Sequence, residues 1–174
     1  SVEAAPDGCR LANASRENFA VQVPFEVVDG RIYVQARVND GGPYRFAIDT
    51  GASGIGRADT TLVGALGLRP QGKASSSDGV RTAAVDTVRL DSLALGGLEM
   101  KAVEVITRDY GSRMPARARF HGIIARDFFA DGLLVLDYPG KTLSFSRTLS
   151  LPDAGTGILP YEGAFRIPVS VGGV

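Results

Sequence analysis

Short stretches of alternating hydrophobic and polar residues, separated by turn-forming residues, run along most of the chain. The clearest is residues 31–38, where apolar side chains stand at even positions, as in a strand with one buried face. Asp-Gly at 29–30 precedes it and Asn-Asp-Gly-Gly at 39–42 follows it, and both are typical turn sequences. Residues 21–28 alternate more loosely, and an apolar strand is predicted at 44–48. This succession predicts a run of hairpins at the start of an all-β fold.

The same alternation returns in the second half of the chain. Residues 85–95 and 98–106 alternate on either side of Gly-Gly at 96–97, which predicts another hairpin. Residues 133–145 have the pattern of a further hairpin. Strands therefore dominate the prediction from end to end.

One segment departs from this pattern. Residues 60–68 favour a short helix that ends near Gly67, before Pro70, with Asp59 or Thr60 as its candidate cap. We therefore expect one or two short helices within an all-β fold.

Composition and charge narrow the possible partners. The chain has 174 residues, of which 44% are hydrophobic, so it is long enough for one domain with a proper core. Lys plus Arg equals Asp plus Glu at 19 each, and this balance predicts no nucleic-acid partner. No apolar run is long enough to span a bilayer. The small, polar start resembles mature sequence after signal removal, which predicts a periplasmic or secreted protein, and Cys9, the only cysteine, is expected to be an incidental free thiol.

Candidate chemistry begins with Asp49, which ends a predicted strand. Thr50 places a hydroxyl beside the carboxylate, and Gly51 lets another backbone or a substrate approach closely because it has no Cβ. Ala52 and Ser53 keep the site narrow. This order suits a rigidly held carboxylate. Taken alone, however, Asp-Thr-Gly is more often a simple turn, since Asp and Gly are common in turns.

A second motif lies between His121 and Phe129. Its central residues are two apolar side chains, a small one, a cation and an acid: Ile123, Ile124, Ala125, Arg126 and Asp127. In this order and spacing, the two motifs resemble those of the retropepsin-like (retroviral-type) aspartic peptidases. The resemblance covers roughly residues 22–148, and the closing hairpin looks like that of bacterial members of the family.

The resemblance implies a closed acid-protease barrel in which Asp49 is catalytic and residues 50–53 support its loop. The late motif would be structural. The polar, small-residue segment 71–82 is a solvated loop by composition, but the resemblance implies a flap that covers substrate. Its central residues would be Ser76, Ser77, Asp78 and Gly79.

Peptide hydrolysis by this route needs two carboxyl groups that share one proton. The sequence supplies one Asp-Thr-Gly, so the second carboxylate is expected from another copy, in a homodimer or in a second similar domain of the same protein. No metal or cofactor is expected, because one Cys and one His give no zinc site and the glycines after Asp49 lack the lysine of a phosphate loop.

Two residues depart from the family pattern. Ala125 stands where a glycine is usual, so its methyl group could alter the packing under Asp49. Ser53 stands where retroviral members often carry an acid, which leaves Arg126 without that partner.

The predicted organisation has three parts. Residues 1–20 form an arm, residues 21–150 the retropepsin-like domain, and residues 151–174 a linker with the first strand of a truncated second repeat. That repeat is predicted because residues 165–173 share the rhythm of residues 29–42, although an ordinary closing strand would give the same pattern. The expected function is aspartic endopeptidase activity on peptides or proteins. The alternative is a catalytically inactive module of the same fold that binds peptides or dimerises.

Overall fold

The computed structural model describes residues 16–77 and 82–151, and their regular structure is almost entirely β. The strands are β1 (Val21–Pro24), β2 (Glu26–Val28), β3 (Arg31–Val38), β4 (Gly41–Asp49), β5 (Gly56–Asp59), β6 (Gly72–Ser77), β7 (Thr82–Leu95), β8 (Leu98–Arg108), β9 (Gly122–Ala125), β10 (Leu133–Asp137) and β11 (Thr142–Ser146). The helical segments are η1 (Arg16–Asn18), α2 (Thr60–Ala65), η2 (Ala116–Ala118) and η3 (Arg126–Phe129). The all-β prediction is confirmed.

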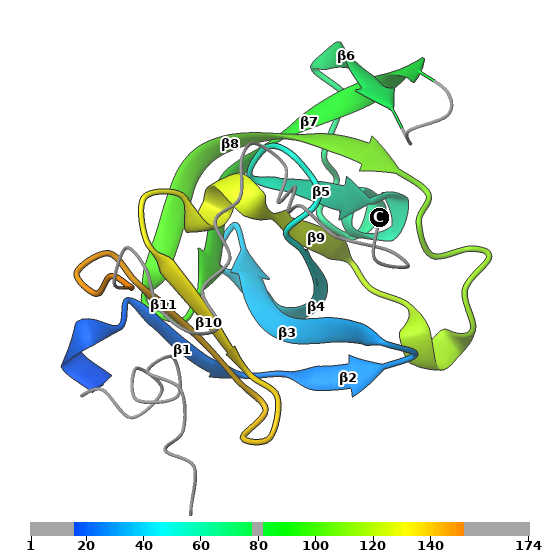
Figure 1. The fold of residues 1–174 in the computed structure, drawn as a ribbon. Coiled ribbons are helices and arrows are strands. Elements are labelled where there is room, and N and C mark those ends of the chain that lie inside the picture. Colours follow the sequence, from blue (N-terminus) through cyan, green and yellow to red (C-terminus); the bar gives the residue numbers. More distant parts are fainter. Residues whose placement is uncertain (1–15, 78–81, 152–174) are drawn as a thin grey trace, which may run out of the picture.

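Eight strands form one sheet in the order β2-β3-β4-β9-β5-β8-β7-β6, and a three-stranded sheet has the order β1-β11-β10 (Figure 1). A further pairing joins β3 to β7, where Val38 opposes Leu93. Because of this pairing, the strands β3, β4, β9, β5, β8 and β7, in that order, form a closed ring. Strands β6 and β7 extend from it as a long hairpin.

The predicted turns are confirmed, and the second is tighter than the sequence indicated. Asp29 and Gly30 both have positive φ angles, 50° and 76°, between the paired residues Val28 and Arg31. The next turn needs only Asn39 and Asp40, again with positive φ, because β4 already begins at Gly41. Positive φ at both central residues gives the twist that two-residue hairpins require, and Asp and Asn tolerate this conformation.

Residues 21–28, whose sequence alternates only loosely, form two strands in different sheets. Strand β1 pairs with β11, whereas β2 pairs with β3. Between them the buried Phe25 donates its backbone N–H to the carbonyl of Lys141. Pro24, which has no N–H to continue a ladder, stands at the point where the chain changes sheets.

The core lies on one face of the central strands. Phe46 of β4, Ala58 of β5 and Ile124 of β9 are all fully buried. The two large side chains, Phe46 and Ile124, each contribute about 1.5–3 kcal/mol on burial. Because side chains alternate along a strand, residues 47, 49, 57, 59 and 123 lie on the opposite face, where the candidate site is found.

The predicted short helix is present and ends near Gly67, as expected. Helix α2 spans Thr60–Ala65, and Gly67 follows with a positive φ of 62°, so the helix does not continue to Leu68. Asp59 is the N-cap residue, and its side chain accepts from the N–H of Thr61. Across residues 16–77 and 82–151, no helix has the length and apolar character that crossing a bilayer requires.

Candidate active site

Asp49 ends β4, next to the parallel strand β9. Phe46 to Asp49 pair with Gly122 to Ala125, so Asp49 lies directly opposite Ala125 of the late motif. The two predicted motifs, far apart in sequence, therefore meet at one point of the sheet. The Asp49 side chain is exposed there.

The chain that follows Asp49 turns back to hold its carboxylate. Oδ1 accepts hydrogen bonds from the backbone N–H groups of Gly51 (3.0 Å) and Ala52 (3.2 Å). A Cβ at position 51 would lie 3.2 Å from the same oxygen, so the absence of a Cβ in glycine leaves room for the Asp49 carboxylate. Oδ1 is thus fixed by the backbone, which orients the carboxylate. Within the described residues, no hydrogen bond is directed at Oδ2.

The late motif holds the Asp49 loop in place. The N–H of Arg126 donates to Ala52 O (3.1 Å), and the N–H of Asp127 donates to Gly54 O (3.0 Å). The carboxylate of Asp127 accepts in return from the N–H of Gly54 (2.9 Å). These contacts fit the structural role that the sequence predicted for Ile123, Ile124, Ala125, Arg126 and Asp127.

The structure accommodates both departures from the family pattern, at Ala125 and at Ser53. The methyl group of Ala125 is fully buried, and its N–H still donates to Ile55 O (2.9 Å), so the loop accommodates it. Arg126 has an acidic neighbour in place of the one that Ser53 replaces, because its Nε lies 3.4 Å from Oδ1 of Asp127.

The sequence identified Asp59 only as a candidate helix cap, and its wider structural role was missed. This side chain is 1% exposed. Its Oδ2 accepts from the N–H and hydroxyl of Thr61, and its Oδ1 accepts from the N–H groups of Tyr110 (2.8 Å) and Gly111 (3.1 Å). The capping position before residue 60 was the only sequence signal, and it gives no indication of the contact with residues 110–111.

The segment after β8 is a largely exposed loop with anchors in the core. Most of residues 109–119 are exposed, but Ala118 is buried and its carbonyl accepts a hydrogen bond from the hydroxyl of Tyr33. Tyr110 packs against Phe120, with ring centroids 6.0 Å apart. Burial raises the pKa of the Tyr110 hydroxyl, although the nearby charges of Arg57 and Arg108 oppose this, so the neutral hydroxyl is favoured. The hydrogen bond from its N–H to Asp59 anchors Tyr110 beside the buried cluster of Tyr33, Ala47 and Phe120.

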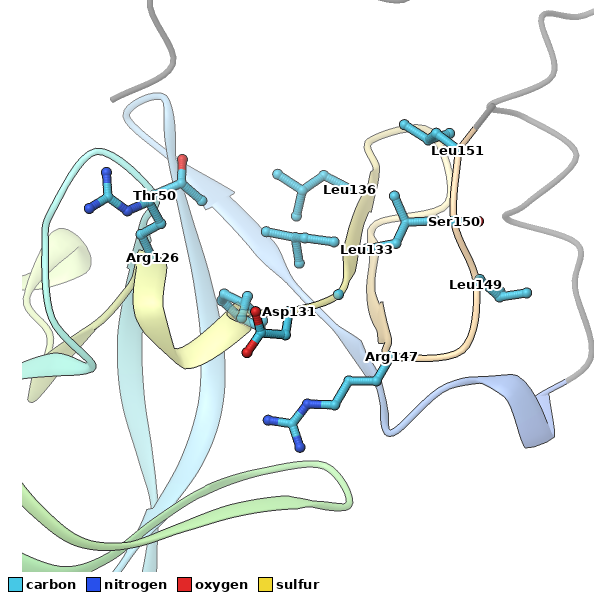
Figure 2. A pocket seen from close by; sticks show the side chains of 12 residues that line it. Thr50, Arg126, Asp131, Leu133, Leu136, Arg147, Leu149, Ser150 and Leu151 are labelled. Atoms are coloured by element: carbon cyan, nitrogen blue, oxygen red, sulfur yellow. The ribbon is translucent and has the colours of Figure 1, made fainter. Parts of the chain in front are cut away.

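Thr50 of the Asp49 loop lines two cavities. One, of about 380 Å³, is also lined by Asp49 and by apolar residues that include Ile32, Phe120 and Ile123. The other, of about 780 Å³, has Thr50 and Arg126 on one side and leucines of β10 and of residues 149–151 on the other (Figure 2). Thr50 lines both cavities, so the Asp49 loop lies between them.

The flap prediction falls only partly within the described residues. Ser76 and Ser77 lie in β6, paired with Ala83 and Thr82 of β7, so this region is a hairpin and not a loop. Asp78 and Gly79 lie outside the described residues. The backbone carbonyl of Ser76 accepts from Arg108 (3.4 Å), which connects the hairpin to the end of β8. Its role in covering substrate stays a prediction.

Residues 16–77 and 82–151 contain no cluster of three or more His, Cys, Asp or Glu side chains that could hold a metal ion. No curated protein matches the chain. A family model described as "Aspartyl protease" matches residues 34–128, more than half of the chain, and this match includes both the Asp49 loop and the late motif. The chain therefore belongs to the retropepsin-like aspartyl protease family.

Proposed function

We propose that this protein is an aspartic endopeptidase in which Asp49 supplies one of two catalytic carboxylates. The observation that carries the proposal is the geometry of Asp49: the side chain is exposed, and its Oδ1 is fixed by two backbone N–H groups. Its loop is also hydrogen-bonded to the late motif. A carboxylate held in this way is oriented without being buried, as a group that must exchange protons with water and substrate requires.

The proposed mechanism uses a pair of carboxyl groups that share one proton, because two like charges a few ångströms apart are not both ionised. The ionised member takes a proton from a water molecule held between them, and the water attacks the peptide carbonyl. The protonated member donates a hydrogen bond to the carbonyl oxygen and later transfers its proton to the leaving amine. Asp49 serves as either member, and no covalent intermediate forms.

The second carboxylate comes from another copy of this fold. Two other acids near the loop are engaged elsewhere: Asp127 accepts from Gly54, and Asp59 is buried. The face of the larger cavity offers a place for the second copy, because the leucines of β10 there are only partly buried and Thr50 lies at its edge (Figure 2). Strand β10 has a ladder partner on one side only within the described chain. A copy bound to this face would arrive beside Asp49.

Replacement of the candidate catalytic group tests the function. We expect Asp49→Asn to abolish cleavage of a denatured protein substrate while the melting temperature stays close to that of the wild type. An amide keeps the shape of the side chain and the acceptor for Gly51 and Ala52 but cannot hold the shared proton. Asp91→Asn, at an exposed position on β7, is the matched control and should keep full activity.

Two outcomes would contradict the proposal. Undiminished cleavage by Asp49→Asn would show that another group carries the reaction. A wild-type protein that binds peptides but cleaves none of them, over a wide range of pH and protein concentration, would favour the inactive binding module instead.

A further inference from the structure

The face of the sheet that carries Asp49 also carries two arginines. Ile123 of β9 lies opposite Ala47 of β4 on one side and opposite Arg57 of β5 on the other. Paired residues project their side chains from the same face of a sheet, so Arg57 shares the face of Ala47 and Asp49. Strand β9 is therefore the only strand between Arg57 and the strand that ends at Asp49.

Strand β8 adds the second arginine. It runs parallel to β5, with Ile106 opposite Arg57 and Arg108 opposite Asp59. Arg57 and Arg108 are thus diagonal neighbours, a separation of roughly 7–8 Å that long side chains can bridge. Asp59 lies between them on the same face, but both of its oxygens already accept hydrogen bonds from the backbone or from Thr61.

Both guanidinium groups keep donors available. Arg57 is half-buried, and its Nη1 donates to the carbonyl of its neighbour Gly56 (2.9 Å). Arg108, also half-buried, makes one long contact of 3.4 Å, to Ser76 of the hairpin. Within residues 16–77 and 82–151, neither forms an ion pair. A guanidinium has five N–H donors in a planar fork that matches a carboxylate.

Tyr110 brings a third donor to the same place. It packs against the buried cluster of Tyr33, Ala47 and Phe120, and Ala47 lies on the sheet face that carries Asp49. Burial raises the pKa of the Tyr110 hydroxyl, which favours the neutral, hydrogen-bond-donating form. Arg57, Arg108 and Tyr110 are thus brought to the face of the sheet that carries the candidate catalytic carboxylate.

We propose that Arg57, together with Arg108 and Tyr110, forms a subsite that selects an acidic side chain, Asp or Glu, in the substrate near the scissile bond. This inference rests on the proposed peptidase function and adds its substrate class. The substrate carboxylate accepts charge-assisted hydrogen bonds from the guanidinium groups, and the Tyr110 hydroxyl donates a further one. A substrate amide in the same place would leave these interactions weaker, because hydrogen bonds to charged groups are about twice as strong.

The test is cleavage-site profiling with a random decapeptide library and mass spectrometry. We expect Asp and Glu to be enriched at one position near the cleaved bond. With peptides that differ only by Glu or Gln there, we expect kcat/KM to favour Glu by about tenfold or more, as a charged hydrogen bond implies.

The Arg57→Gln variant should lose most of this preference, and Arg57→Lys should keep part of it. Arg57→Glu should instead prefer Lys at this position of the substrate. Arg89→Gln, at an exposed position on β7, should leave the preference for Glu unchanged.

A purely structural role for Arg57 would lower activity on both peptides equally, and an unchanged Glu-to-Gln ratio in Arg57→Gln would overturn the proposal. A wild-type ratio of kcat/KM near one would also overturn the acidic subsite, although the peptidase function would remain.

If no peptide is cleaved, a binding measurement tests the subsite. Asp49→Asn protein should bind a labelled random peptide pool with a fixed central Glu more tightly than the matching Gln pool, and Arg57→Gln should remove the difference. Equal binding of the two pools would refute the acidic subsite.

Discussion

Two aspartates at strand ends show how the surroundings of a residue decide its role. Asp49 ends β4 and Asp59 ends β5, and both accept backbone N–H groups. Asp49 is exposed with one oxygen held, whereas Asp59 is buried with both oxygens engaged. The sequence could identify Asp49 because its partners are the next residues in the chain. It could not distinguish Asp59, whose decisive partners lie more than fifty residues away.

We predict that Asp59→Ala destabilises the protein by about 2–5 kcal/mol, because it removes a helix N-cap and leaves buried N–H groups of residues 110 and 111 without an acceptor. Asp59→Asn keeps one acceptor oxygen and should cost less. Chemical denaturation measures both, with Asp109→Asn as an exposed neighbouring control. The alanine variant should also release Tyr110 from the cleft and lower activity beyond its loss of folded protein. A melting curve identical to that of the wild type would contradict the anchoring role of Asp59.

Hairpins were predictable at the scale of elements, and the insertion of β9 was not. The turns at residues 29–30 and 96–97 join strands that pair with their immediate neighbours, so local sequence determines the contact. Strand β9, in contrast, enters between β4 and β5, which precede it by more than sixty residues. Its short apolar sequence fits many places in a sheet. Only the resemblance of its motif to a family indicated that it supports the Asp49 loop.

The insertion of β9 depends on Gly122. A Cβ there would lie 2.4 Å from the ring of Phe46 and 2.5 Å from the backbone carbonyl of Arg57. We predict that Gly122→Ala destabilises the protein by about 1–3 kcal/mol or more, because the flanking strands must move apart. Gly64→Ala is the matched control: a Cβ at position 64 would meet nothing within 4 Å, and alanine in helix α2 should stabilise by about 0.5–1 kcal/mol. Equal thermal stability of the two variants would show that β9 is not tightly enclosed.

At the scale of the whole molecule, the ring of strands presents one oriented candidate catalytic carboxylate. The fold class could be predicted because alternation and turn residues recur along the chain. The face proposed to meet a second copy could not be predicted, because its members come from distant segments: Thr50, Arg126, Leu133 and Leu151 meet only in the folded chain (Figure 2). The predicted second repeat at residues 165–173 lies outside the described residues and stays a prediction.

This face gives the last prediction, that activity depends on pairing. Leu133 lies in β10, is partly exposed and lines the larger cavity. Leu133→Glu places a charge on the proposed interface and should weaken pairing at least tenfold, roughly 1.4 kcal/mol. Val27→Glu, which changes a 42% exposed valine on β2, is the matched control and should not weaken pairing.

If two chains pair, activity at low concentration should rise with the square of protein concentration, since the dimer is then scarce. Sedimentation should show the Leu133→Glu protein dissociating at higher concentration than the wild type. If the second copy is a further domain of the same polypeptide, Leu133→Glu should lower the activity of that polypeptide at every concentration. A strictly monomeric single-domain chain with robust cleavage would contradict the requirement for a second carboxylate.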